Sequence, residues 1–230
     1  LERAAMLPDG MGWLAQASPE LRSEIARRCD LIVAQEVRSL YWAGDPASGI
    51  FGVVSGRLDV HLPHWGGERS LVHVLGPGWW IGDMAAITGE LRRLDVTMHG
   101  DTRLMRLSRA EIGRICDRFP EMQRCLLAMM AANMRTLIEV VESLGFSDPT
   151  SRVGACLFRL DRTGSGWQGR LPVTQGELAV IARLSRRRTN AALNVLEASG
   201  ALRLRYREIE IRDRQRLREL IENWERRRPG

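Results

Sequence analysis

Residues 173–202 read VTQGELAVIARLSRRRTNAALNVLEASGAL, and this stretch decides the fold of the second half of the chain. Thr174 and Glu177 have the spacing of a capping box that opens a short helix. After a brief turn, Ser185 is suited to cap a second helix, and Gly200 is suited to follow its last turn. Two short helices joined by a tight turn predict a helix-turn-helix motif.

The second helix of this motif, residues 186–199, is expected to have two different faces. Its apolar side comprises Thr189, Ala192, Leu193 and Leu196. Its polar side comprises Arg187, Asn190, Ala191 and Asn194, with Arg186 near the edge. Arginine presents two parallel donors that match O6 and N7 of guanine, and asparagine can do the same for adenine. Amides at a helix N-terminus can hold a phosphate. The expected DNA contacts are Thr174, Gln175, Ser185, Arg186, Arg187, Arg188, Asn190 and Asn194.

An alternating pattern follows Gly200. Apolar residues Leu202, Leu204 and Tyr206 alternate with arginines, and Ile209 and Ile211 then alternate with glutamates. Alternation of this kind predicts a pair of strands, of which the first is basic on one face. Together with the two helices, this pair predicts a winged helix-turn-helix domain.

The two parts of the chain differ in charge. Residues 1–147 carry 16 arginines and 18 acidic residues, a net charge of −2, whereas residues 148–230 carry 18 and 10, a net charge of +8. A near-neutral region joined to a basic one is typical of a regulatory domain followed by a nucleic-acid-binding domain. All 34 basic residues are arginine. P-loop enzymes, protein kinases and Schiff-base enzymes need a lysine, so these classes are excluded.

Residues 32–107 have the pattern of short β-strands. Apolar stretches occur at 50–54, 58–62, 71–75 and 103–107, and glycine-rich turns separate them. Strands at this spacing predict an all-β barrel or sandwich. Ser108 and Glu111 then predict a capping box at the start of a helix.

A long helical pattern follows Pro120. Its apolar positions step by four and three residues and form the seam Leu126, Met130, Asn133, Leu137, Val140 and Leu144. Such a seam predicts a two-fold dimer with these helices side by side, and packing against the chain's own barrel is the alternative. Gly145 to Pro149 interrupt the pattern and mark a hinge. The expected domains are an effector-sensing barrel with flanking helices at 1–119, a dimerisation helix at 120–145, and a DNA-binding domain at 146–230.

The four cysteines, Cys29, Cys116, Cys125 and Cys156, are widely spaced. No pair has the CxxC spacing of zinc or iron–sulfur ligands, so no metal and no cofactor is expected. Dispersed thiols are typical of a reducing cytoplasm. No apolar run reaches 18 residues, so no membrane-spanning helix is expected either.

Over nearly its whole length the sequence resembles the Crp/Fnr family of bacterial transcription regulators. The opening of that family's barrel resembles residues 41–60, which read YWAGDPASGIFGVVSGRLDV. The lead into its phosphate-binding cassette resembles residues 75–85, which read LGPGWWIGDMA. The resemblance implies an α+β fold with an N-terminal double-stranded β-helix or jelly-roll barrel, a long dimerisation helix and a C-terminal winged helix-turn-helix. It also implies a homodimer whose partners are double-stranded DNA with a palindromic operator and RNA polymerase.

The cassette departs from the family members that bind cyclic nucleotides. Those members have Arg-Ser or Arg-Thr followed by Ala where residues 92–95 read Arg-Arg-Leu-Asp. Asp83 replaces the glutamate that takes the ribose hydroxyl, and Leu137-Ile138 replaces the Thr-Ser pair that reads adenine. Cyclic AMP is therefore not the expected effector; another small effector, a degenerate pocket and control by a partner protein stay open. The candidate effector pocket comprises Trp80, Gly82, Asp83, Met84, Arg92, Arg93 and Leu137.

The helix-turn-helix departs as well. The family's Ser-Arg-Glu-Thr opening is Ser-Arg-Arg-Arg at 185–188, and Arg183 stands where the family turn often has glycine. The leading interpretation is a dimeric, sequence-specific DNA-binding regulator without enzymatic activity. A non-specific architectural protein that uses its arginines only for phosphates and a cyclic nucleotide-responsive regulator are the alternatives. An enzyme with a regulatory barrel is disfavoured, because no segment of this sequence is left over for a catalytic domain.

Overall fold

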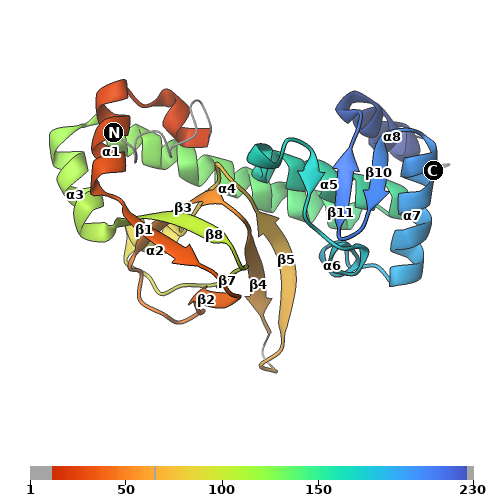
Figure 1. The fold of residues 1–230 in the computed structure, drawn as a ribbon, viewed down its shortest axis with the longest axis horizontal. Coiled ribbons are helices and arrows are strands. Elements are labelled where there is room, and N and C mark those ends of the chain that lie inside the picture. The colour runs from red at the N-terminus through yellow and green to blue at the C-terminus, as the bar shows by residue number, and fades with distance from the viewer. Residues whose placement is uncertain (1–11, 65, 227–230) are drawn as a thin grey trace. The chain divides into compact units, whose positions relative to one another are not determined.

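The computed structural model describes residues 12–64 and 66–226 (Figure 1). Within these residues the chain forms two compact units, one comprising residues 12–64, 66–69 and 74–135 and the other residues 70–73 and 136–226. Both helices and sheets are present, as expected for the α+β class. Among the described residues, no helix combines the length and the apolar character needed to cross a membrane.

A barrel of two four-stranded sheets makes up most of the first unit, and only Ser70–His73, within one of its edge strands, are grouped with the second unit. One sheet has the order β1 (Asp30–Ala34), β8 (Thr102–Ser108), β3 (Gly49–Ser55), β6 (Trp80–Ile81), and the other the order β2 (Arg38–Tyr41), β7 (Asp95–Met98), β4 (Leu58–Pro63), β5 (Arg69–Leu75). The apolar stretches that predicted strands correspond to β3, β4, β5 and β8, so the barrel prediction is confirmed.

Helices cover one end of this barrel. They are the 3₁₀ helix η2 (Gly12–Gln16), α1 (Pro19–Arg28) and α3 (Arg109–Arg118); α2 (Asp83–Thr88) belongs to the cassette. Leu21 and Ile25 of α1 and Ile115 of α3 pack with Ile50 and Leu107 of the sheet in one buried core. This layer of apolar side chains anchors the barrel to its helices.

The start of α3 differs in one detail from the sequence prediction. The Ser108 hydroxyl accepts the Glu111 amide at 3.2 Å, so the N-cap is confirmed. The Glu111 carboxylate binds Arg28 and Arg114. It therefore forms salt bridges with these arginines rather than the second hydrogen bond of a capping box.

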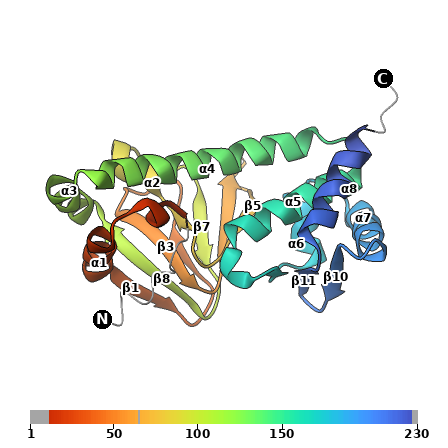
Figure 2. The same cartoon turned by 90° about the horizontal axis from the view of Figure 1, so that it is seen from above.

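Helix α4 (Glu121–Gly145) is a single unbroken helix of 25 residues (Figure 2). Its first half packs into the barrel core through Met122, Cys125, Leu126 and Met129. The expected seam therefore needs correction at Leu126, which is buried within its own chain, and at Asn133, whose amide is hydrogen-bonded to the barrel. Met130, Val140 and Leu144 are half-buried. The exposed apolar side chains form a stripe that we call the α4 stripe: Leu127, Met134, Leu137, Ile138 and Val141.

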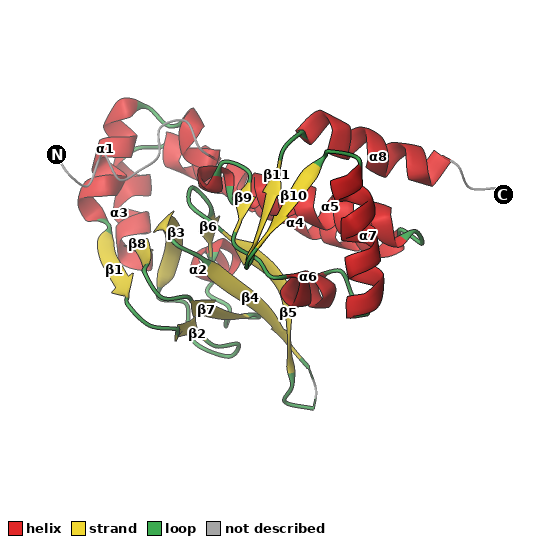
Figure 3. Ribbon diagram, turned by 45° about the vertical axis from the view of Figure 1, so that its right-hand side comes forward, coloured by secondary structure: helices red, strands yellow, loops and turns green. Residues whose placement is uncertain are grey.

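The second unit is a winged helix domain (Figure 3). Its elements are α5 (Pro149–Thr163), η3 (Ser165–Trp167), β9 (Arg170–Leu171), α6 (Gln175–Ile181), α7 (Arg186–Ala198), β10 (Leu202–Arg205), β11 (Glu208–Ile211) and α8 (Arg214–Arg226). Asp148 caps α5 by accepting the Ser151 amide at 2.7 Å. Leu157, Leu178, Leu193 and Leu217 bring α5, α6, α7 and α8 into one core, since each is fully buried.

Candidate DNA-binding surface and effector cassette

The first helix of the helix-turn-helix is fixed at its start by a complete capping box. The Thr174 hydroxyl accepts the Glu177 amide at 3.1 Å, and the Glu177 carboxylate accepts the Thr174 amide at 2.7 Å. The turn after α6 contains Arg183 in the left-handed region, with φ of +51°. Glycine takes this conformation without strain, which explains why an arginine here is unusual.

Helix α7 presents two faces, as the sequence predicts. Ser185 caps it by accepting the Arg188 amide at 3.3 Å, and Gly200 follows it with φ of +81°. Thr189, Ala192, Leu193 and Leu196 are buried. The opposite face exposes Arg186, Arg187, Arg188, Asn190 and Asn194. Within the described part of the chain, the three arginines have no carboxylate in salt-bridge range. Their charge is therefore available to an external polyanion.

The wing is a hairpin of β10 and β11, with Leu202 opposite Ile211 and Arg205 opposite Glu208. Tyr206 lies in its turn and is 91% exposed, and Arg207 follows it with φ of +56°. Glu210 binds Arg205 at 2.7 Å and Arg212 at 2.8 Å, and these hydrogen bonds lower the pKa of the Glu210 carboxyl to about 2. The wing is therefore less basic than its sequence indicates.

The cassette contains a pocket of only about 80 Å³. It is lined by Tyr41, Ile81, Gly82, Asp83, Met84, Ala85, Glu90, Leu91, Arg92, Arg93 and Leu94. Pockets for small-molecule ligands usually measure about 300 Å³ or more. In this conformation the cassette pocket is smaller than a typical ligand site.

Arg92, the first of the two candidate arginines of the cassette, points inward. It is 4% exposed and donates hydrogen bonds to the carbonyl oxygens of Gly49 at 2.6 Å and Gly82 at 2.8 Å. Its guanidinium lies 4.4 Å from the ring centroid of Tyr41 and 5.6 Å from that of Phe51. Burial lowers the pKa of Arg92 and raises that of Tyr41. The guanidinium is thus held by its own chain.

Gly82 is required for this arrangement. Its φ is +94°, and a Cβ atom at this position would lie 2.6 Å from Nη1 of Arg92. A glycine in the left-handed region thus allows the guanidinium to reach the backbone.

Asp83 of the cassette also has an internal partner. Its Oδ1 accepts a hydrogen bond from the Asn133 side-chain nitrogen at 2.9 Å. The Asn133 side-chain oxygen accepts one from the Trp79 indole at 2.9 Å. We call these three residues the Asn133 clamp; it joins α4 to the cassette through the two functions of one amide group.

Five of the predicted effector residues line the cassette pocket, namely Gly82, Asp83, Met84, Arg92 and Arg93, whereas Trp80 and Leu137 do not. Trp80 is in the core, where its ring packs edge-on against Trp13 at 5.4 Å. Met84 and Leu137 are about half exposed, and Arg93 reaches outward to Glu90 at 3.6 Å. Sequence reasoning missed Tyr41 and Phe51, because aromatic residues in strands carry no signal for stacking on a distant arginine.

Comparison with known proteins agrees with this geometry. The cyclic nucleotide-binding domain family matches residues 34–119, and the Crp-like helix-turn-helix domain family matches residues 151–220. The chain belongs to the Crp/Fnr family of transcription regulators. The Crp/Fnr resemblance seen in the sequence is therefore confirmed.

Two Crp/Fnr relatives are similar over most of their length. The cyclic AMP receptor protein of Thermus thermophilus is 27% identical over 183 residues, which cover 80% of this chain and 84% of that protein. The CRP-like cAMP-activated global transcriptional regulator of Mycobacterium tuberculosis is 27% identical over 185 residues, covering 78% and 82%. The structure of FixK2 from Bradyrhizobium japonicum shares the fold, with a TM-score of 0.69 at 22% identity over 84% of this chain and 96% of that one.

Proposed function

We propose that the protein is a homodimeric regulator that binds an inverted repeat in double-stranded DNA through α7. The exposed arginines and asparagines of α7 carry this proposal, because they lack partners in the described chain and match the donor patterns that read guanine and adenine. Thr174, Gln175 and Ser185 would hold phosphates beside them. Arg186, Arg187 and Asn190 would face the bases, and Arg188 a phosphate.

The dimer would form along the α4 stripe. A continuous line of exposed leucine, methionine, isoleucine and valine side chains is costly in water, and a second α4 would bury it. We retain the division into a sensing domain (1–119), a dimerisation helix (120–145) and a DNA-binding domain (146–230). A two-fold dimer would place the recognition helices about 34 Å apart, one helical turn of DNA.

Cyclic AMP would not control this regulator. The Arg92 donors are already bound to Gly49 and Gly82, Asp83 is bound to Asn133, and the pocket is smaller than a typical ligand site. Although the two curated relatives are named for cyclic AMP, the residues that would receive the nucleotide here are engaged within the chain. The cassette acts instead as a structural element.

Sequence selection tests the proposal. Sites selected from random DNA should contain an inverted repeat with half-sites about ten base pairs apart, and cyclic AMP should change neither the sequence nor the affinity. Selection of no consensus would favour the non-specific architectural protein, whose affinity depends on salt and not on sequence. Micromolar binding of cyclic AMP, coupled to tighter operator binding, would favour the cyclic nucleotide-responsive regulator.

Further expectations follow from a regulator of this type. It would act on the chromosome in the cytoplasm and contact RNA polymerase at promoters, and it would have no enzymatic activity of its own. Transcription in vitro with purified polymerase, with and without the selected site, measures the polymerase contact directly.

A further inference from the structure

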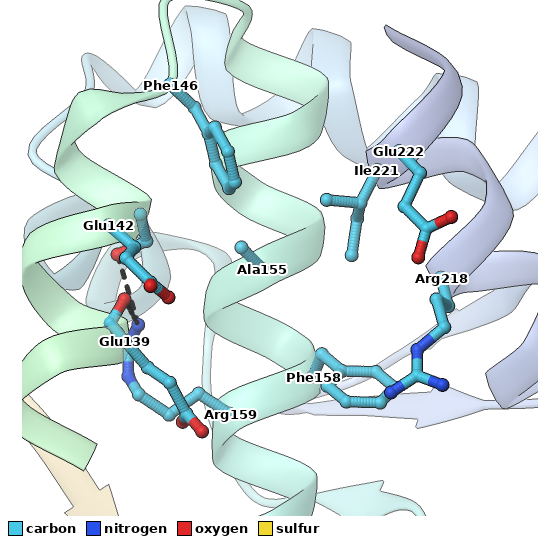
Figure 4. A pocket seen from close by; sticks show the side chains of 10 residues that line it. Glu139, Glu142, Phe146, Ala155, Phe158, Arg159, Arg218, Ile221 and Glu222 are labelled. Atoms are coloured by element: carbon cyan, nitrogen blue, oxygen red, sulfur yellow. Dashed lines mark hydrogen bonds between the residues drawn. The ribbon is translucent and has the colours of Figure 1, made fainter. Parts of the chain in front are cut away.

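Two hollows of the second unit differ in charge. The first measures about 220 Å³ and is lined by residues of α4, α5 and α8 together with Phe146 (Figure 4). Its lining includes three glutamates, Glu139, Glu142 and Glu222, against two arginines. A lining with more acidic than basic groups repels a polyanion, so this hollow is not suited to DNA.

The second hollow lies beside the wing and has the opposite balance of charge. It measures about 320 Å³ and lies between the start of α6, at residues 174–176, and the wing turn. Its charged residues are Arg205, Arg207 and Glu208. Arg205 is bound to Glu210 at 2.7 Å, and its Nε lies 3.9 Å from a Glu208 oxygen. Arg207 is exposed and forms no salt bridge within the described residues, so the wing turn carries one available cation.

The wing turn consists of Tyr206 and Arg207, between the paired residues Arg205 and Glu208. Tyr206 is 91% exposed, more than any other large apolar or aromatic side chain of the described chain, and its side chain has no hydrogen bond or ring contact there. Two-residue turns usually contain asparagine or glycine, because these accept a positive φ, yet Arg207 has φ of +56°. Neither side chain is needed to form the turn, and both are available to a ligand.

The wing has a fixed position beside α7. The Leu204 amide of β10 donates to Oε1 of Glu197, on α7, at 2.7 Å. At the other end of α7, a Cβ atom at Gly176 would lie only 3.6 Å from Nη2 of Arg186. Because Gly176 lines the second hollow, the first arginine of α7 borders that hollow as well. The arginine face of α7, the hollow and the wing turn therefore form one continuous surface.

We propose that the wing turn enters the DNA minor groove next to the bases read by α7, and that Tyr206 and Arg207 favour A·T base pairs there. This inference rests on the proposed function, since α7 must first hold the DNA. Paired strands lie about 4.8 Å apart, so the tip of the hairpin matches a minor groove about 6 Å wide.

The two side chains of the turn select the minor groove rather than a phosphate. Proteins that bind the minor groove combine arginines with apolar wedges, and narrow A·T-rich grooves attract arginine. The amino group of guanine projects into this groove and would obstruct the Tyr206 ring. A phosphate contact would use the charge of Arg207 but not the ring of Tyr206.

Inosine distinguishes reading in the two grooves. An I·C pair has the minor-groove pattern of A·T, because inosine lacks the guanine amino group, but the major-groove acceptors of G·C. Operators are compared that carry A·T, I·C or G·C pairs about five base pairs, half a helical turn, to the inner or the outer side of the bases read by α7. At one of these positions the parent protein should bind the A·T and I·C operators alike and the G·C operator about 5-fold more weakly.

Variants assign this preference to the wing turn. Tyr206→Ala should bind all three operators alike and leave the thermal midpoint unchanged, because the side chain is exposed. Arg207→Asn, which keeps a residue suited to a positive φ, should also lower the salt slope by about one. Trp42→Ala and Arg216→Gln remove an exposed aromatic ring and an exposed cation outside the wing and the helix-turn-helix, and should leave affinity and base preference unchanged.

Three results would overturn the inference. One is equal affinity of the parent protein for the three operators at both positions, which leaves at most a phosphate contact. A second is an I·C operator that behaves like the G·C operator, since the preference would then arise in the major groove. A third is a Tyr206→Ala variant that keeps the parent's preference. Failure to select any half-site for α7 would contradict the proposed function as well, whereas a selected half-site without a minor-groove preference contradicts the wing contact alone.

Discussion

The cassette and the recognition helix use the same side chain in opposite ways. Arg92 is buried and bound to two carbonyl oxygens and two aromatic rings of its own chain. Arg187 on α7 is exposed and has no carboxylate partner in the described chain. A satisfied guanidinium contributes to folding, whereas a free one is available to a ligand. The position of an arginine in a family motif therefore does not decide its role; its partners do.

The largest effect is expected from variants of α4, which binds the cassette through the Asn133 clamp and carries the proposed dimer interface. Leu137→Asp combined with Val141→Asp places two carboxylates in the α4 stripe, where a partner helix would have to bury them. We expect monomers in sedimentation experiments and a loss of operator affinity of more than about 100-fold, because two half-sites no longer act together. Arg124→Gln with Arg135→Gln makes the same charge change on exposed positions elsewhere on α4 and should leave the dimer intact. A dimeric double-aspartate variant would show that the stripe is not the interface.

The next largest effect distinguishes a buried arginine from an exposed one by the change that each alanine variant makes in the free energy of unfolding. Arg92→Ala removes two charge-assisted hydrogen bonds and leaves the Gly49 and Gly82 carbonyls without this donor. We expect the free energy of unfolding to fall by about 2–4 kcal/mol in denaturant titrations. Arg93→Ala, on an exposed side chain, should change it by less than about 0.5 kcal/mol. If both variants unfold at the same denaturant concentration, Arg92 is not structural.

Variants of α7 should show the reverse pattern, with altered DNA binding and unchanged stability. Arg187→Ala should cost about 1–3 kcal/mol of operator affinity and relax the preferred base at one position. Arg188→Ala should weaken binding to all sequences alike and lower the salt slope by about one. Site selection with both variants measures this difference. An exchange of the two outcomes would mean that α7 lies in the groove rotated by about one residue.

The smallest effect concerns the turn between α6 and α7. Arg183 has a left-handed backbone at φ of +51°, so Arg183→Gly should relieve strain and raise the free energy of unfolding by about 0.5–1 kcal/mol. Arg187→Gly, within α7, should instead lower it by about 1 kcal/mol. Thermal unfolding of the two glycine variants measures whether each one raises or lowers the free energy of unfolding. If Arg183→Gly lowers the free energy of unfolding, the Arg183 side chain stabilises the fold by more than its left-handed backbone destabilises it.

The sequence correctly predicted those features that depend only on residues close together in the chain. The capping box at Thr174, the Ser185 cap and the buried side of α7 each depend on residues a few positions apart. The burial of Leu126 was not predicted, because periodicity does not show which side of a helix its own barrel covers, and Leu126 lies on that side. The partners of Arg92 come from β2, β3 and the start of α2, so only the folded barrel brings them together.

The Asn133 clamp also restricts the order in which this sequence can change during evolution. Asp83 gives up its internal partner only if Asn133 is replaced, and that replacement also removes the acceptor of the Trp79 indole. The loss of the hydrogen bond to the buried Asp83 carboxylate costs about 1–3 kcal/mol until something else binds it. A descendant that acquires a hydroxyl-bearing effector at this cassette would pass through a less stable intermediate. In homologues, positions 83 and 133 should therefore change together more often than either changes alone.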